Sequence, residues 1–431
     1  MTTNMKPVRL NTCAIFRFIA CVICFLTFAP TLQSVMAQQR RVTSTPPPEG
    51  KNFRLASAKG SVKVPFELFE DGILLQFRIN NSRPIWFFFD TGASVNIINE
   101  SLAKKSGLTG SGVTSVEGSG GSTSGFVVND VSISLPGVEA YHQTLTAILL
   151  DQLSAYEGRE MGGIIGNPFI MNFVVEIDYA RKVLTFYDRK VYNLAGEPDT
   201  IPLEARDGQP FVKVELSMNG RDTISDLFMI DTGSDRIFHV NRPFAEAHRL
   251  MAALPGAGTV ETVGAGTGGQ TRFTEVRVSS LRLGGYSITR PVISISQDAE
   301  GIGASDNAGI VGAELLRRFT LVLDYQSKRM RLKPNASFNE PFEIDMSGLN
   351  LMSKPDDFRV IQVERVRAQS PAAEAGLRQG DVLVTINRRP AGELGLDKLS
   401  KMFRQSGRTY LLTIRRGAQV ITARLKMRRA V

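Results

Sequence analysis

Cysteine and histidine are scarce in this sequence. Of its 431 residues, three are cysteines and three are histidines. Cys13, Cys21 and Cys24 all lie before residue 38, so a chain processed at that point has no thiol for catalysis and no disulfide. The histidines lack metal-ligand spacing, and surface or helix positions are expected for His239 and His248. We therefore expect no metal site and no cofactor.

Long apolar runs are absent after residue 37, so no membrane-spanning helix is expected there. Before it, basic residues precede an apolar run at about 18–28, and Val35-Met36-Ala37 offers the small residues of a cleavage site. Residues 1–37 are therefore predicted to be a signal peptide, the alternative being an uncleaved segment that associates with a membrane. Residues 38–50 are predicted to be a proline-rich linker.

An exported chain without cysteines must rely on packed cores for its stability. This favours a bacterial periplasm or cell envelope, with secretion or membrane anchoring as alternatives. The net charge is +9, and the residues from Asp345 onward hold 17 Lys/Arg against 8 Asp/Glu. Such a basic surface is either simply solvated or attracted to an acidic partner or an anionic membrane. Without interleaved aromatic residues, it does not indicate nucleic-acid binding.

The feature that decides the interpretation is a pair of Asp-Thr-Gly triplets. Phe87-Phe88-Phe89-Asp90-Thr91-Gly92-Ala93-Ser94 is matched by Leu227-Phe228-Met229-Ile230-Asp231-Thr232-Gly233-Ser234. Each triplet follows an apolar run typical of a buried strand. Each is followed by an apolar-apolar-glycine signature, Gly163-Ile164-Ile165-Gly166 in the first case and Gly309-Ile310-Val311-Gly312 in the second.

A further pair of matching segments supports the duplication of one unit within the chain. Val175-Glu176-Ile177-Asp178-Tyr179 is matched by Leu321-Val322-Leu323-Asp324-Tyr325 at the same offset as the glycine signatures. Echoes at a nearly constant offset predict two copies of one unit and a two-lobed, mainly β body. The lobes are predicted to cover residues 51–190 and 201–335.

Each copy supplies one carboxylate, and the two would meet across a pseudo-twofold axis. Asp90 and Asp231 would then share one proton, because two adjacent carboxylates cannot both ionise. Such an acid–base pair can activate water and hydrolyse a peptide bond without a covalent intermediate. Gly92 and Gly233 allow a tight turn around the carboxylates, and the hydroxyls of Thr91, Thr232 and Ser234 are expected to orient the pair.

Residues 340–431 form a third predicted unit. A strand at Val360–Val363, a short helix at Ser370–Leu377, a buried strand at Val382–Asn387 and a helix near 394–403 precede two closing strands. This order is typical of a small α+β domain.

The duplicated pattern resembles the aspartic peptidases, the pepsin and retropepsin clan. In this family, each lobe pairs an Asp-Thr/Ser-Gly loop with an apolar-apolar-glycine segment. The resemblance covers about residues 51–334 and implies that Asp90 and Asp231, with Thr91, Gly92, Thr232, Gly233 and Ser234, form the catalytic site of an endopeptidase acting on polypeptides.

The C-terminal unit resembles a PDZ domain of the bacterial envelope-protease type. The matching residues are Ser370-Pro371-Ala372-Ala373, Ala375-Gly376-Leu377 and Gly380-Asp381-Val382-Leu383. The resemblance implies that Gly348-Leu349-Asn350-Leu351 is a loop that binds the carboxylate of a peptide C-terminus. The alternative is a PDZ-like unit that only packs against the lobes.

The sequence also departs from the peptidase family. The expected flaps, Gly118–Gly121 and Gly264–Gly269, are glycine-rich and carry no aromatic residue. Ala93 stands where pepsin-like enzymes place a hydroxyl, which leaves the pKa of Asp90 less depressed and predicts an activity optimum nearer neutral than strongly acid.

Two other functions remain open from sequence alone. The first is a non-catalytic envelope protein that binds partners through its PDZ domain and a degenerate cleft. The second is a protease that is active only as a dimer, with lobes pairing between chains.

Overall fold

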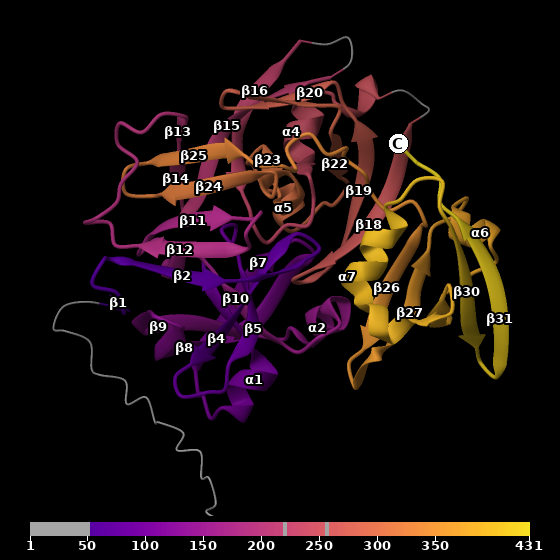
Figure 1. Ribbon diagram of the computed structural model, residues 1–431, viewed down its shortest axis with the longest axis horizontal. Helices are drawn as coiled ribbons and strands as arrows, with labels where there is room; N and C mark the ends of the chain where they lie inside the picture. Colours follow the sequence, from indigo (N-terminus) through magenta and orange to yellow (C-terminus); the bar gives the residue numbers. More distant parts are fainter. Residues whose placement is uncertain (1–51, 219–221, 255–257) are drawn as a thin grey trace, which may run out of the picture. The chain divides into compact units, whose positions relative to one another are not determined.

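The computed structural model describes residues 52–218, 222–254 and 258–431 (Figure 1). The signal-peptide and linker predictions concern residues 1–50 and lie outside this part of the chain. The described chain is mainly β, as predicted, with four sheets and short helices. None of its helices is long and apolar enough to cross a membrane.

The first sheet has nine strands and is built from residues before 166. Its strands are β1 (Phe53–Leu55), β3 (Glu67–Phe69), β4 (Gly72–Ile79), β5 (Ile85–Phe89), β6 (Asn96–Asn99), β7 (Ser111–Gly118), β8 (Gly121–Leu135), β9 (Val138–Ile148) and β10 (Met161–Ile165). The turn between β3 and β4 is formed by Glu70 and Asp71, both with positive φ.

A ten-stranded sheet repeats this arrangement between residues 204 and 311. Its strands are β14 (Glu204–Arg206), β15 (Gln209–Ser217), β16 (Ile224–Ile230), β17 (Phe238–Val240), β18 (Thr259–Gly266), β19 (Gly269–Arg277), β20 (Ser280–Leu283), β21 (Tyr286–Thr289), β22 (Val292–Ser296) and β23 (Gly309–Val311). In both sheets, the strand before the Asp-Thr-Gly triplet pairs in parallel with the strand of the glycine signature: β5 with β10, and β16 with β23.

The two halves share a third sheet of six strands. It contains β2 (Ser61–Pro65), β11 (Val174–Asp178), β12 (Val183–Tyr187), β13 (Thr200–Pro202), β24 (Phe319–Asp324) and β25 (Arg329–Pro334). At its centre β11 and β24 lie side by side and antiparallel, with Ile177 opposite Leu321 (Figure 1). The two echoing segments of the sequence are therefore partners in one sheet, which relates the lobes by an approximate twofold axis.

The helices of the lobes are short. They are α1 (Glu100–Lys105), α2 (Asp151–Glu157), α3 (Asn167–Ile170), α4 (Arg242–Ala247) and α5 (Ala313–Leu316), with 3₁₀ turns at Met251–Ala253 and Ile302–Ala304. The Asn99 side chain caps α1 by accepting a hydrogen bond from the Ser101 N–H. Asn241 occupies the cap position of α4 but donates to Ser305 and Asn307 instead, so the two lobes differ at this point.

The C-terminal unit forms a fourth sheet, in the order β26-β27-β28-β30-β31 with β29 beside β28. Its elements are β26 (Leu349–Lys354), β27 (Asp357–Val366), α6 (Pro371–Glu374), β28 (Val382–Ile386), β29 (Arg389–Pro390), α7 (Ala391–Phe403), β30 (Thr409–Arg416) and β31 (Gln419–Lys426). The Ser370 hydroxyl caps α6. The helix expected near 394–403 begins earlier, at Ala391, and is kinked at Gly395.

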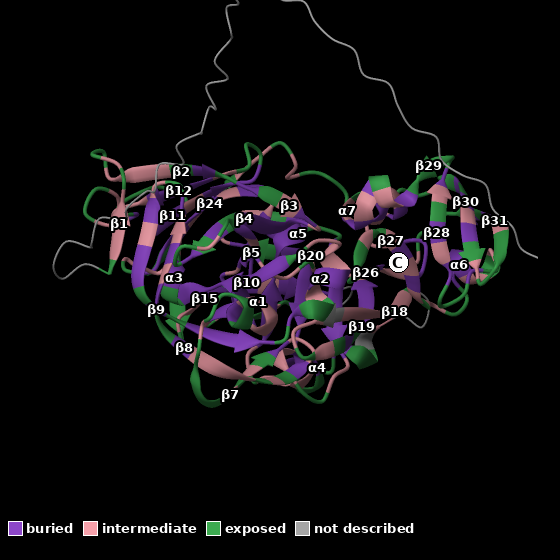
Figure 2. Ribbon diagram, turned by 90° about the horizontal axis from the view of Figure 1, so that it is seen from below, coloured by how far each residue is buried: buried purple, intermediate pink, exposed green. Residues whose placement is uncertain are grey.

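Aromatic side chains fill the core of the first lobe. Phe77, Phe87, Phe169, Phe173 and Phe186 are all fully buried and meet mostly edge to face. The strands β4 and β5, which carry Phe77 and Phe87, are largely buried in Figure 2. This dense packing gives the loop that follows β5 a rigid base.

Candidate active site

The two Asp-Thr-Gly loops are held at the ends of buried strands. The Asp90 N–H donates to the Ile165 carbonyl at 3.0 Å, and the Asp231 N–H donates to the Val311 carbonyl at 3.0 Å. In both lobes, the strand of the glycine signature therefore holds the backbone of the Asp-Thr-Gly loop by a hydrogen bond. Each aspartate leaves its strand at the same point, which brings one carboxyl from each lobe toward the shared axis.

Asp90 and Asp231 lie within hydrogen-bonding reach of each other. Each loop glycine touches the carboxyl of the other lobe: a methyl group placed on Gly92 would lie 2.5 Å from Asp231 Cγ, and one on Gly233 would lie 2.4 Å from Asp90 Cγ. Any side chain here would push the carboxyls apart. Glycine is thus required for close approach.

Backbone N–H groups orient each carboxylate. The Gly92 N–H donates to Asp90 Oδ1 at 2.7 Å, and the Gly233 N–H donates to Asp231 Oδ1 at 2.8 Å. Ser234 contributes its N–H, at 3.2 Å from Asp231 Oδ1, while its hydroxyl accepts from the Arg236 N–H at 3.4 Å. The hydroxyl role expected for Ser234 is therefore taken by its backbone.

Thr91 and Thr232 lock the loops together. The Thr91 hydroxyl donates to the Ile230 carbonyl at 2.6 Å and accepts from the Thr232 N–H at 3.1 Å. The Thr232 hydroxyl donates to the Phe89 carbonyl at 2.7 Å and accepts from the Thr91 N–H at 3.1 Å. Both threonines are fully buried. These four bonds cross between the lobes and fix the distance between the two aspartates.

Burial makes ionisation of this pair unfavourable. It raises the pKa of Asp90 above its ordinary value, although the hydrogen bonds that this carboxylate accepts oppose the change. Burial, followed by the charge of Asp90, raises the pKa of Asp231 well above its ordinary value. The arrangement therefore favours one proton shared by the two carboxyls.

Two supporting residues escaped the sequence analysis. The Asn167 amide donates to the Thr91 and Ala93 carbonyls at 2.7 and 3.1 Å, and its Oδ1 accepts from the Tyr325 hydroxyl at 2.6 Å. The Gln209 amide donates to the Gly92 carbonyl. The position of Asn167 directly after the first glycine signature was a usable signal, whereas Gln209 comes from the other lobe and had none.

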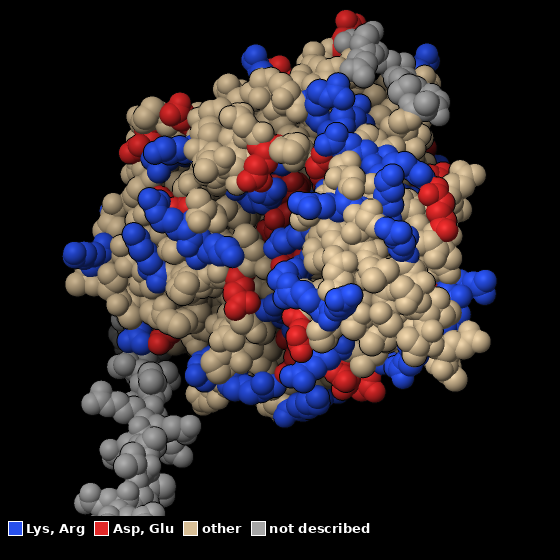
Figure 3. Space-filling view, turned by 45° about the vertical axis from the view of Figure 1, so that its right-hand side comes forward, with Lys and Arg blue, Asp and Glu red and all other residues tan. Residues whose placement is uncertain are grey.

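A cleft of about 1750 Å³ contains both aspartates. Figure 3 shows a hollow on one face of the molecule with acidic and basic side chains along it. The two predicted flaps form hairpins on this cleft, β7–β8 and β18–β19, and their tips meet: the Gly120 N–H donates to the Thr267 carbonyl at 2.9 Å. A methyl group on Gly120 would lie 2.2 Å from the Gly269 carbonyl oxygen, so the glycines allow the tips to interlock.

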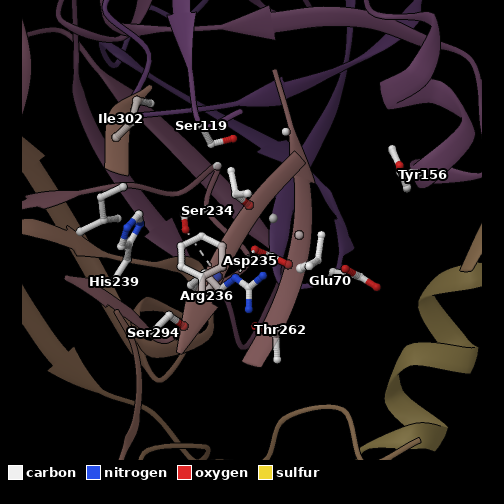
Figure 4. A pocket seen from close by; sticks show the side chains of 18 of the residues that line it. Glu70, Ser119, Tyr156, Ser234, Asp235, Arg236, His239, Thr262, Ser294 and Ile302 are labelled. Atoms are coloured by element: carbon white, nitrogen blue, oxygen red, sulfur yellow. Dashed lines mark hydrogen bonds and ion pairs between the residues drawn. The ribbon is translucent and has the colours of Figure 1, made fainter. Parts of the chain in front are cut away.

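Two side chains in the wall of the cleft, Glu70 and His239, have pKa values shifted far from their ordinary ones. Burial and the charge of Asp235 raise the pKa of Glu70 to about 7. Burial lowers the pKa of His239 to about 3, so this side chain is neutral. His239 lies on β17 and is buried edge-on against Phe273, which corrects the expected surface or helix position. Figure 4 shows His239 and Glu70 in the same pocket with Ser119 of the first flap.

The described residues contain no group of three or more histidine, cysteine, aspartate or glutamate side chains placed to hold a metal ion. In the C-terminal unit, Gly348 precedes β26 in a left-handed conformation (φ 77°), and Leu349, Asn350 and Leu351 form the start of that strand. This is the position that the resemblance implies for a carboxylate-binding loop.

Family models match two parts of the chain. A family model described as aspartyl protease matches residues 75–169, which include Asp90 and the first glycine signature, and a PDZ domain model matches residues 362–416. No curated protein matches the sequence.

Many solved structures are similar, among them the following two. The first is the aspartic proteinase from Irpex lacteus, with 14% identity over 65% of this chain and 99% of that one, at a TM-score of 0.39. The second is the photosystem II D1 C-terminal processing protease, with 20% identity over 22% of this chain, at a TM-score of 0.20. The match spans 25% of that protein's chain. On the family matches, this chain carries an aspartyl protease domain and a PDZ domain.

Proposed function

We propose that this protein is an exported aspartic endopeptidase in which Asp90 and Asp231 activate a water molecule between them. The observation that carries the proposal is the reciprocal contact of the two loops, in which each glycine touches the carboxyl of the other lobe. Both carboxyls come from one chain, so the proposal does not need lobes paired between chains.

The proposed reaction gives the two carboxyls different roles. Asp90 is ionised and takes a proton from the water, whose oxygen attacks the peptide carbonyl carbon. Asp231, which holds the shared proton, donates it to the carbonyl oxygen. The resulting gem-diol intermediate collapses when the proton on Asp90 passes to the amide nitrogen, a hydroxyl of the intermediate returns its proton to Asp231, and the C–N bond breaks. Asp90 is then ionised and Asp231 protonated, as at the start.

The flaps suggest how a substrate is held. An extended polypeptide in the cleft would lie beneath the hairpins β7–β8 and β18–β19 and could pair with their backbones. Because the tips interlock through glycine backbone, they would have to separate to admit it. Water exclusion would thus depend on backbone contact between the tips and not on an aromatic side chain.

Substitution of each aspartate by asparagine tests the proposal. Asp90→Asn and Asp231→Asn keep the side-chain shape and an oxygen for the loop N–H groups, so folding should be retained while cleavage of an unfolded protein such as casein falls by about 10³-fold or more. Asp226→Asn is the matched control, because Asp226 is exposed on β16. Pepstatin, which carries a hydroxyl that mimics the intermediate, should inhibit the unsubstituted protein.

The same experiment distinguishes the proposed peptidase from the alternative, a non-catalytic binding protein. If the unsubstituted chain binds unfolded protein without cleaving it, or if either asparagine variant cleaves normally, the dyad mechanism is wrong.

Export is supported by the basic residues and apolar run before residue 38. Mass spectrometry of the mature N-terminus, combined with cell fractionation, tests it: an intact N-terminus on a cytoplasmic protein contradicts export.

A further inference from the structure

The open edge of the PDZ sheet is the natural place for a peptide. Within the described residues, β26 pairs with β27 on one side only, and α7 lies along the same end of the sheet. A peptide bound by such a domain adds a strand at the free edge and places its terminal carboxylate in the loop that precedes it. Both positions are already filled by this chain.

The free edge is covered by the first lobe. The helix α2 and the glycine that ends it lie against β26 and α7: a methyl group on Gly158 would lie 3.3 Å from Ser353 Oγ of β26 and 3.5 Å from Leu396 Cδ1 of α7. Both contacted side chains are buried. Gly158 is therefore wedged between the two walls of the peptide groove.

A hydrogen bond secures this contact. The Tyr156 hydroxyl of α2 donates to Glu364 Oε1 of β27 at 2.5 Å, and the Gln270 amide of the second flap hairpin donates to the same oxygen at 3.2 Å. Figure 4 shows Tyr156 on α2, beside the pocket and facing the C-terminal unit. One carboxylate of the PDZ domain thus binds both α2 and a flap hairpin.

The carboxylate loop is satisfied internally as well. The Gly348 N–H donates to Asp345 Oδ1 at 2.6 Å, and the Leu349 N–H donates to the Ser347 hydroxyl at 2.9 Å. The Ser347 hydroxyl in turn donates to the Asp345 carboxylate. The loop therefore has the chemistry to bind a carboxylate, and it holds one from its own chain. Asn350 completes the contact by donating to the Val263 carbonyl of β18 at 2.7 Å.

The segment that fills the groove also lines the catalytic cleft. Leu153, Tyr156 and Glu157 of α2 face the same cleft as Asp90 and Asp231. Withdrawal of α2 from the PDZ groove would therefore move one wall of the cleft and release the contact of Glu364 with the flap hairpin.

We propose that residues 150–158 act as an internal ligand of the PDZ groove while Asp345 occupies its carboxylate loop, and that a peptide ending in an apolar residue with a free carboxylate displaces both and thereby changes cleavage in the cleft. A peptide that binds only the open groove has an apparent dissociation constant equal to its intrinsic one divided by the fraction of molecules whose groove is open. Any substitution that weakens the hold of α2 must tighten peptide binding. The effect on cleavage rests on the proposed function, whereas the displacement does not.

Tyr156→Phe in the full chain tests the displacement. It removes the hydroxyl that holds Glu364 and keeps the ring, and Glu364→Gln weakens the same bond from the other side. Tyr192→Phe is the matched control, since the Tyr192 hydroxyl has no hydrogen-bond partner in the described part of the chain. The probe is a fluorescein-labelled hexapeptide ending in leucine with a free carboxylate, compared with its C-terminal amide by fluorescence anisotropy.

The free-acid peptide should bind Tyr156→Phe and Glu364→Gln about tenfold more tightly than the unsubstituted chain or Tyr192→Phe, and the amide should bind weakly to all four. Hydrogen exchange in residues 150–158 should rise when the free-acid peptide is added. Equal affinity for all four proteins, an absence of peptide binding, or unchanged exchange would each overturn the proposal.

Cleavage is a separate readout. A change in the rate of casein cleavage on addition of the free-acid peptide, lost in Asp231→Asn, supports coupling to the cleft. An unchanged rate in an active protein overturns the coupling. If the unsubstituted protein is inactive, the proposed function fails, while the binding and exchange results still decide whether α2 is displaced.

Discussion

The threonine cross-link between the lobes can be tested by one nearly isosteric substitution. Thr232→Val keeps the shape of the side chain but removes the hydroxyl that donates to the Phe89 carbonyl at 2.7 Å and accepts from the Thr91 N–H at 3.1 Å. Both partners are left in a region that water does not reach, because Phe89 and Thr91 are fully buried. The variant therefore carries one unpaired carbonyl and one unpaired N–H.

An unpaired buried polar group costs about 1–3 kcal/mol, so two such groups should lower the free energy of unfolding by about 2–6 kcal/mol. This is a large part of the total stability of a typical domain, which is about 5–15 kcal/mol. Thr91→Val should have a similar cost, because it leaves the Ile230 carbonyl and the Thr232 N–H unpaired in the same way.

Urea unfolding followed by tryptophan fluorescence measures this effect. The only tryptophan of the chain, Trp86, lies on β5, four residues before Asp90. Thr200→Val is the control: its hydroxyl also donates to a backbone carbonyl, that of Glu197, but at an exposed position where water can replace it, so a change below about 1 kcal/mol is expected. A Thr232→Val variant as stable as the control would refute the idea that these bonds hold the lobes together.

Three further outcomes are expected. Because the pKa of Asp231 is raised in the folded state, the folded protein binds the proton more tightly than the unfolded chain. The free energy of unfolding should therefore fall as pH rises from the ordinary pKa of an aspartate to the raised pKa of the folded state. Asp231→Asn should remove that slope, and a pH–rate profile that peaks at strongly acid pH would contradict the raised pKa values. Gly120→Ala should lower kcat/KM by about 10- to 100-fold by separating the flap tips, while Gly285→Ala, whose new methyl group meets open space, should not. Arg404→Met should lower the free energy of unfolding in urea by about 1–3 kcal/mol, because it breaks the ion pair of 2.8 Å between the end of α7 and the buried Glu314, which keeps Arg317 and Arg318 as partners; a loss too small to measure would show the pair to be dispensable.

The fold class and the pairing of the two loops were predictable from the sequence. The triplets at Asp90 and Asp231 sit in local patterns that repeat at a nearly constant offset, and a buried strand followed by a glycine turn is encoded by neighbouring residues. The capping of α1 by Asn99 was predictable for the same reason, whereas the failure of Asn241 to cap α4 depends on Ser305 and Asn307, which are distant in sequence.

The contacts between units were decided by the tertiary structure alone. Glycine-rich flaps were predictable from the sequence, but the contact of Gly120 with Thr267 was not. A carboxylate loop was predictable at Gly348, but its occupation by Asp345 was not. Likewise, nothing near Gly158 in the sequence indicates a place between β26 and α7. Composition and periodicity report which residues a segment buries and where it turns, because these depend on neighbours along the chain. They do not report which distant surface covers it, because that depends on the shapes of two surfaces that meet only after folding.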